Sequence, residues 1–355
     1  MEIGSEFWLN SMPEKSFKEL PNWLKKFGNT VLTSSGRGAI TLLLKQIQPT
    51  NKSVLLPAYI CESVILPFLE QGYSCHYYEV NENLIPNLDS INSFKNIGVF
   101  LHMGYYGFST NSNLEDVLQN LSAQSTIIIE DITHTMFSSY ERYENNDFYM
   151  GSIRKWVGIP SGGFLSSAAT MNENDLLENS AFSAKRLEAL INKGKYIKTN
   201  KIELKEIALN QFSEAEDWLD RDAIPHRIDE LSANIVGALN EEELITRRKE
   251  NFINLSNGMK TIDFIHPIFE ELDERVCPMF FPVLIKGKRQ HIKKKLTEES
   301  IYCPIHWPIP EQIEINELNI TSNIYNCILS IPCDQRYGVE DMDRIISVLK
   351  SIQQF

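Results

Sequence analysis

Residues 30–44, TVLTSSGRGAITLLL, lead from an apolar strand pattern into an amphipathic helix through a turn of small residues. The helix pattern begins near Gly38, and glycines allow the backbone to turn tightly in front of it. The free N–H groups at the start of a helix, together with the helix dipole, can bind a phosphate group. A plain strand-to-helix turn is the alternative. The residues that would surround a phosphate are Ser35, Gly36, Arg37 and Gly38.

The alternation of strand and helix patterns continues along the first two thirds of the chain. Short apolar runs predict strands at 30–32, 54–56, 75–79, 97–101 and 127–129, with a hairpin strand at 163–166. Helical patterns lie between them, at 38–46, 62–71 and 114–119. This order predicts an α/β fold in which helices cover both faces of a mostly parallel sheet. Such sheets bind ligands beyond the carboxyl ends of their strands.

From about residue 240 the pattern changes to that of a smaller α+β unit. A charged helix at 241–254 is followed by a strand at 280–285, a basic helix at 289–296, and a strand, turn and helix within 328–350. We therefore expect an N-terminal arm at 1–28, a large domain at 29–240 and a small C-terminal domain at 241–355.

The charge balance limits the possible partners. The chain has 34 Lys and Arg residues against 47 Asp and Glu residues, a net charge of −13. Such a chain repels nucleic acid and anionic membrane surfaces, so an anionic ligand requires a local positive site. No segment has the pattern of a signal peptide or a membrane span, so we expect a cytoplasmic protein. The six cysteines lack disulfide or zinc-ligand spacing, which predicts free thiols and no metal site.

A lysine in an apolar segment is the first candidate for chemistry. Residues 151–163, GSIRKWVGIPSGG, place Lys155 before Trp156 and a Gly-Gly pair. Burying a charged ammonium group is costly, and a lowered pKa or a covalent bond avoids that cost. A neutral amine is also what reacts with an aldehyde, so burial would prepare Lys155 as a Schiff-base nucleophile. A solvated lysine beside a tight turn is the alternative.

Two further loops carry candidate residues. In IIIEDITHTMF, residues 127–137, Asp131 follows a strand of isoleucines and His134 comes three residues later. A carboxylate there can keep a cationic ring protonated, and an imidazole can lie against that ring. A helix cap with an incidental histidine is the alternative. In LPAYICESVI, residues 56–65, Tyr59 and Cys61 point into the loop after a strand.

Taken together, these loops predict a cofactor. A phosphate site, an aspartate for a ring nitrogen, an imidazole against the ring and an amine for an aldehyde are the groups that hold pyridoxal phosphate. They occur here in an order that a parallel sheet can bring to one edge.

The same stretches resemble the DegT/StrS-like aminotransferases, which act on nucleotide-linked sugars and belong to the fold type I pyridoxal phosphate enzymes. The resemblance extends along nearly the whole chain, and KWVGIPSGG is its most specific part, because the family's Schiff-base lysine lies at the same distance before a Gly-Gly pair. The other similar stretches are SSGRGAI, VLLPAYICESVILPFLEQGYSCHYYEV, VFLHMGYYG, IIEDITHTMFS, HRIDELSANIVGALN, YCPIHW and LSIPCDQRYGVEDMDRIISVL.

The resemblance implies a role for each matching residue. It makes Lys155 the residue of the internal aldimine and Asp131 the partner of the pyridine nitrogen, with His134 against the ring. It also implies a homodimer with shared active sites. Ser152, three residues before Lys155, is a further candidate for contact with the cofactor. Candidates for contact with the substrate are His226, Arg227, His306 and Arg336.

The chain departs from the family pattern at several positions. Met150 stands where the family has a phosphate-binding serine, and Arg37 replaces a threonine of the phosphate loop. Cys61 occupies the place of a stacking aromatic residue, and Pro225 the place of an asparagine offered to the neighbouring subunit. We expect Arg37 to replace lost phosphate contacts, and a tyrosine among Tyr59, Tyr105 and Tyr106 to supply the stacking ring.

The expected activity is transfer of an amino group from an amino acid, glutamate by resemblance, to a keto group of a nucleotide-linked sugar. The alternatives are a pyridoxal phosphate enzyme of another reaction type and a binding or scaffold protein that has kept the fold without catalysis. The family's sugar dehydratases carry histidine in place of the lysine, so Lys155 disfavours that reaction. A nicotinamide enzyme and a serine hydrolase are disfavoured because their glycine-rich motifs are missing.

Overall fold

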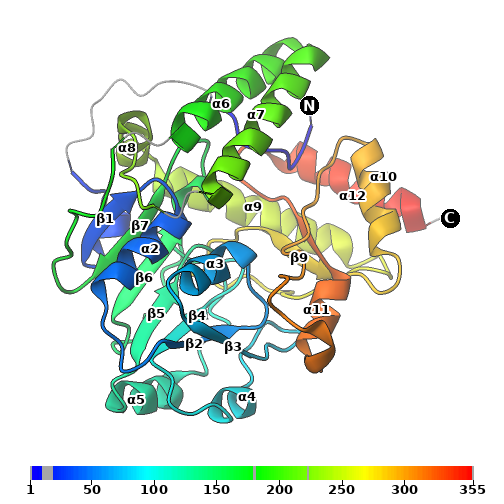
Figure 1. Cartoon of the computed structure of the whole chain (residues 1–355). Coiled ribbons are helices and arrows are strands. Elements are labelled where there is room, and N and C mark those ends of the chain that lie inside the picture. Colours follow the sequence, from blue (N-terminus) through cyan, green and yellow to red (C-terminus); the bar gives the residue numbers. More distant parts are fainter. Residues whose placement is uncertain (1, 10–18, 179–180, 222–223, 354–355) are drawn as a thin grey trace.

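The computed structural model describes residues 2–9, 19–178, 181–221 and 224–353 of the 355-residue chain. Its main sheet has seven strands in the order β1-β7-β6-β5-β4-β2-β3 (Figure 1). Strand β7 runs antiparallel to β1 and β6, and the other pairs are parallel. The predicted α/β fold with a mostly parallel sheet is therefore confirmed. The strands are β1 (Asn29–Thr33), β2 (Ser53–Pro57), β3 (Ser74–Tyr78), β4 (Val99–Met103), β5 (Ile127–Asp131), β6 (Phe148–Ser152) and β7 (Gly163–Ser167).

Alternate residues of the central strands enter different hydrophobic clusters. On β4, Val99 and Leu101 belong to one cluster and Phe100 belongs to another. Because successive side chains of a strand point to opposite faces, both faces of the sheet are buried. The first face is covered by α2 (Gly36–Gln46) and α3 (Glu62–Glu70), and the second by α5 (Glu115–Ala123) and α9 (Glu241–Met259).

The C-terminal part forms the second, smaller unit. Its antiparallel sheet has the order β10-β9-β8, with β8 (His266–Pro267), β9 (Phe281–Leu284) and β10 (Ile328–Ile331). The helices around it are α9, α10 (Arg289–Glu298), α11 (Thr321–Cys327) and α12 (Val339–Gln353). The strands and helices predicted after residue 240 are thus present. One hydrophobic cluster contains both Phe100 of the large sheet and Leu329 of β10, so the two units share a core.

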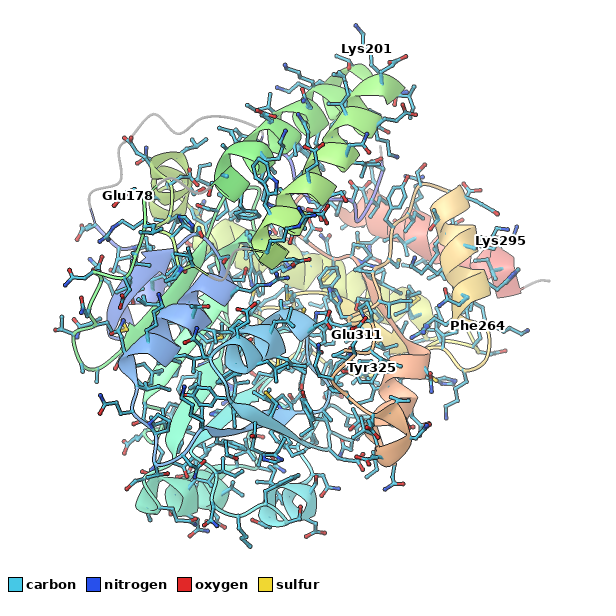
Figure 2. The ribbon with its side chains drawn as sticks, viewed as in Figure 1. Glu178, Lys201, Phe264, Lys295, Glu311 and Tyr325 are labelled. Carbon is cyan, nitrogen blue, oxygen red and sulfur yellow. The ribbon has the colours of Figure 1, made fainter. Side chains whose placement is uncertain are left out.

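The sequence analysis did not predict a helical hairpin that follows β7 in the sequence. Helices α6 (Ala181–Thr199) and α7 (Ile202–Arg221) run side by side at the top of Figure 1, and Lys201 lies at the tip between them (Figure 2). The buried positions of α7 are Ala208, Phe212, Ala215 and Leu219. Their spacing is helical, but two of the four are alanine, so the apolar stripe is narrow and easily overlooked.

Several element boundaries differ from the prediction. The strand expected at 97–101 is Val99–Met103, and the helix expected at 114–119 is Glu115–Ala123. Strand β6 was missed because FYMGS has no alternation of polar and apolar residues. Helix α2 begins two residues early, because the Ser35 hydroxyl caps it by accepting from the N–H of Gly38 at 3.0 Å.

The remaining short helices are α1 (Asn22–Lys25), α4 (Leu88–Asn92), α8 (Glu230–Gly237) and the 3-10 turns Ile153–Lys155 and Ile315–Glu317. All six cysteines are free thiols; burial was expected for them, and Cys277, Cys303 and Cys333 are buried while the other three are half-buried. Within the described ranges, no helix has the length and apolar character that a membrane crossing requires.

Candidate active site

A cavity of about 200 Å³ lies where β4, β5 and β6 end, beside the turn that follows β1. This is the edge at which an open parallel sheet places its functional groups. The structure brings together here most of the predicted site residues: Ser35, Gly36, Arg37, Cys61, Asp131, His134, Ser152, Lys155 and His306.

Lys155 closes the 3-10 turn that follows β6. The carbonyl of Gly162 accepts hydrogen bonds from the N–H groups of Ile153 and Arg154, which fixes this turn against β7. Lys155 is exposed rather than buried as expected, and it lines the cavity. Its amine has no ion pair or hydrogen bond within the described part of the chain. Removal from bulk water, and secondly the charge of Arg154, lower the pKa of Lys155. A lowered pKa increases the fraction of neutral, nucleophilic amine.

Asp131 ends β5 and is 3% exposed. One of its oxygens, Oδ1, accepts from the backbone N–H of Thr133 at 2.8 Å. Among the described residues, no basic side chain lies within salt-bridge distance of this carboxylate. Burial raises the pKa of Asp131 to about 6, because a buried carboxylate without a counter-ion is unfavourable. The site therefore offers a place for a cationic group.

The turn between β1 and α2 lies on another side of the same cavity. The N–H groups of Gly36 and Arg37 open α2 and have no hydrogen-bond acceptor in the described ranges. The guanidinium of Arg37 pairs with Asp220 of α7, and its buried Nε has no partner. Gly163 contacts this turn so closely that an added Cβ would lie 2.2 Å from the Ser35 carbonyl. These unpaired donors form a site for an anion.

Two histidines border the cavity. Nδ1 of His134 accepts from the N–H of Tyr106 at 3.2 Å, and Nδ1 of His306 lies 2.8 Å from the Ser330 hydroxyl. Burial, followed by the charge of Lys155, lowers the pKa of His306 to about 3. Burial also holds the pKa of His134 well below its usual range, with contributions from His306 and Lys155. Both imidazoles are therefore neutral at physiological pH.

An aromatic residue that the sequence analysis did not select stacks on His134 in the cavity. Trp307 lines the cavity and stacks on His134, with ring centroids 5.3 Å apart and an interplanar angle of 30°. Tyr59 is buried beside the cavity, where its hydroxyl lies 3.1 Å from that of Tyr106. Neither Tyr59 nor the two tyrosines at 105 and 106 line the cavity.

Four predicted residues lie elsewhere or have other partners. Gly38 points its N–H at Ser35, as described above, and the carbonyl of His226 accepts from the N–H of Ser34 at 2.8 Å. Arg227 pairs with Glu173 and with Glu178, which Figure 2 shows at the edge of the molecule. Arg336 pairs with Asp334 and donates to the carbonyls of Ser5 and Glu6, so it holds the N-terminal segment.

The sequence analysis missed two charged residues of the site. Arg154 donates two hydrogen bonds to Glu216, at 2.6 and 3.2 Å, and both residues line the cavity. Arg154 precedes Lys155 and was visible in the sequence, but its partner comes from the unpredicted α7. No pattern in the sequence connects residues 62 positions apart.

The groups that remain unpaired in this cavity fit pyridoxal phosphate. Asp131 lacks a cation, which a pyridinium nitrogen would supply. The N–H groups of Gly36 and Arg37 and the Nε of Arg37 lack an anion, which a phosphate would supply. The amine of Lys155 has no partner among the described residues, and an aldehyde is the group with which it would react.

Comparisons with known proteins agree with this fit. Residues 185–350 match the model of the DegT/DnrJ/EryC1/StrS aminotransferase family. No curated protein sequence matches the chain.

Solved structures show the same fold at low sequence identity. DesV from S. venezuelae is 16% identical, with a TM-score of 0.67 over 94% of this chain and 87% of that one. PseC from Helicobacter pylori, an aminotransferase of pseudoaminic acid biosynthesis, is 13% identical, with a TM-score of 0.67 over 99% of this chain and 100% of its own. Spr1654 from Streptococcus pneumoniae, a putative sugar aminotransferase in its PMP form, is 15% identical, with a TM-score of 0.68 over 98% of this chain and 92% of its own.

The family model matches just under half of the sequence, and the shared fold extends over almost all of it. This confirms the resemblance found in the sequence and the prediction of an enzyme. Residues 185–350 of the chain are thus similar to the DegT/DnrJ/EryC1/StrS aminotransferase family.

Proposed function

We propose that the protein is a pyridoxal phosphate-dependent aminotransferase that moves an amino group from an amino acid, with glutamate as the donor, to a keto group of a nucleotide-linked sugar. The observation that carries this proposal is the meeting of Lys155, Asp131 and the turn at 35–37 in one cavity. The sugar acceptor is supported by the family match and by the sugar aminotransferases among the solved structures with this fold.

Each of these residues has a separate task in the proposed reaction. The start of α2, with Ser35 and Arg37, would hold the cofactor phosphate. Asp131 would accept a hydrogen bond from the pyridine nitrogen and keep it protonated. When bound, the cofactor supplies an electron sink for the negative charge that develops on the α-carbon of the donor.

Lys155 would carry the proton. Its lowered pKa increases the fraction of neutral amine, which can take the proton from the donor α-carbon and later return it. His134 is held by the N–H of Tyr106 and stays neutral, so it can lie against a cationic ring without repelling it. Trp307, stacked on His134, excludes water from that side of the cavity.

A visible absorption spectrum tests the proposal. The purified protein, loaded with pyridoxal phosphate, should show a visible band that disappears when glutamate is added. A scaffold protein would show neither. A protein that binds the cofactor but leaves every amino acid unconverted would contradict the proposed transamination.

The assembly is part of the proposal. Aminotransferases of this fold type form their active sites at the interface of a homodimer, and we propose that this chain is also a homodimer with shared active sites. Light scattering during size-exclusion chromatography should give twice the chain mass of 40.8 kDa. A monomer that shows full activity would contradict shared sites.

A further inference from the structure

A second cavity, of about 400 Å³, lies on the other side of Lys155. It is lined by the N-terminal segment Gly4–Phe7, by the loop that follows β10 and by residues of α6, α7 and α9. Lys155, Arg154, Glu216, Met279 and His306 line both cavities, so the two meet at the reactive amine. The volume lies in the range of small-molecule sites.

Basic groups outnumber acidic groups in this second cavity. Most of the arginines that line it are neutralised by carboxylates. Arg154 binds both oxygens of Glu216, and Arg186 donates to Glu216 at 3.1 Å and to Glu6 at 3.2 Å. Arg336 binds both oxygens of Asp334, in the pair described above. These pairs use every carboxylate that lines the cavity.

Arg248 of α9 is the exception. It is 1% exposed and has no salt bridge within the described residues. Its Nε donates to Gln335 at 2.8 Å, and Nη1 donates to the carbonyls of Pro278 and Met279 at 3.2 and 2.9 Å. No acceptor for Nη2 exists in the part of the chain that the structure describes.

A buried guanidinium without a carboxylate is costly unless an anion completes it. Burial lowers the pKa of Arg248, but the group stays charged, because the pKa of arginine is far above neutrality. Asp334 lies near enough to favour that charge, but Arg336 occupies both of its oxygens. His306 contributes no charge to this balance, because its imidazole is neutral.

We propose that the second cavity is an anion subsite in which Arg248 binds the carboxylate or phosphate group of the substrate whose reacting atom lies at Lys155. This inference rests on the proposed aminotransferase function. The packing of Arg248 supports it: its guanidinium lies 4.4 Å from the centroid of the Trp156 ring, next to Lys155, so the anchor and the reactive amine are held by adjacent residues.

The test is calorimetric titration of the cofactor-loaded protein with three probes. Glutarate carries carboxylates but no reactive amino or keto group, inorganic phosphate represents the other anion class, and glucose is the neutral control. Loading the cofactor first keeps phosphate out of the turn at 35–37. We expect glutarate or phosphate to bind and glucose not to bind, and the anion that binds identifies the class.

The variant Arg248→Gln should lower the affinity for the anion that binds by about tenfold or more, which is the loss typical of a hydrogen bond to a charged group. Arg247→Gln is the matched control, because Arg247 is the neighbouring residue on α9, is exposed and pairs with Glu250. It should leave the affinity unchanged. Equal affinities in wild type and a folded Arg248→Gln protein would overturn the proposal.

A second variant keeps the test decisive if Arg248→Gln does not fold. Ser5→Asp places a carboxylate on the wall of the cavity, while Ser5→Asn adds the same bulk without charge. The aspartate should weaken anion binding by about tenfold relative to the asparagine. Equal binding by the two variants, or no anion binding by wild type whose visible band responds to glutamate, would overturn the subsite but leave the proposed reaction standing. A wild type without that band would instead contradict the proposed function.

Discussion

The carboxyl group of Asp131 makes a measurable prediction for the cofactor-free protein. Its pKa of about 6 in the folded state exceeds the ordinary value of 3.8. Because Asp131 holds its proton more tightly in the folded than in the unfolded state, protonation of this carboxyl group stabilises the fold. The stabilisation is complete when the pH is below the pKa of the unfolded state, and it is lost as the pH rises through the pKa of the folded state. The two values differ by about 2 units, which corresponds to about 3 kcal/mol at most.

Replacing Asp131 by Asn removes this titration and keeps the shape of the side chain. Urea unfolding of both cofactor-free proteins should be measured between pH 4 and pH 8. The amide adds a constant offset from its own hydrogen bonds, so the informative quantity is how the difference in unfolding free energy changes with pH. Between these limits the wild type should lose about 2 to 3 kcal/mol relative to the variant.

Binding of the cofactor should reverse the effect of pH on the relative stability of wild type and Asp131→Asn. A protonated pyridine nitrogen would supply the missing cation, so saturating pyridoxal phosphate should stabilise wild type more than Asp131→Asn at pH 8. The variant should bind the cofactor but transaminate very slowly, because its ring nitrogen loses its proton. Parallel pH profiles for the two cofactor-free proteins would refute the reasoning, since they would show that Asp131 has a counter-ion.

Three further changes test other parts of the site. Lys155→Ala should abolish the visible band and all transamination, and full turnover by this variant would falsify the assignment. Gly163→Ala should weaken cofactor binding about tenfold or more, because the added Cβ would displace the turn at 35–37. Gly338→Ala is the control and should leave cofactor binding unchanged, because nothing lies within 4 Å of its added Cβ. Equilibrium dialysis measures both affinities. Asp220→Asn should tighten cofactor binding by up to about fivefold, because a half-exposed ion pair with Arg37 is weak and its loss frees the guanidinium; weaker binding would show that Asp220 positions Arg37.

Site residues could be predicted from the sequence where the neighbouring residues alone determine their position in the fold. Asp131 follows a run of isoleucines, so the end of a buried strand could be read from neighbouring residues. The apolar segment around Lys155 located this residue at the cavity, but the residue itself is exposed and not buried. The parallel sheet then brings the ends of its strands to one edge, which is why loops far apart in sequence meet in one cavity.

The features of the site that the sequence did not predict depend on contacts between residues of distant elements. Trp307 lies against His134 across almost half the chain, and nothing in the local sequence distinguishes it from Tyr59 as an aromatic residue that borders the cavity. Arg336 looked like a substrate ligand, but a carboxylate two residues away and the carbonyls of the N-terminal segment saturate its donors. A charged residue in a candidate loop is therefore informative only once its own partners are known.

Helix α7 shows what this means for the charge of the active site. Glu216 lines the cavity and pairs with Arg154, and the exposed Asp220, one helical turn later, pairs with Arg37. A phosphate can bind the unpaired Nε of Arg37 while Nη1 stays paired with Asp220. Because Asp220 partly neutralises this guanidinium, we expect most of the binding energy to come from the free N–H groups at the start of α2. At the other end, Glu216 raises the pKa of Lys155 against the opposing effects of burial and Arg154. The narrow apolar stripe that hid this helix in the sequence thus also concealed the carboxylates that set the charge on both sides of the reactive amine.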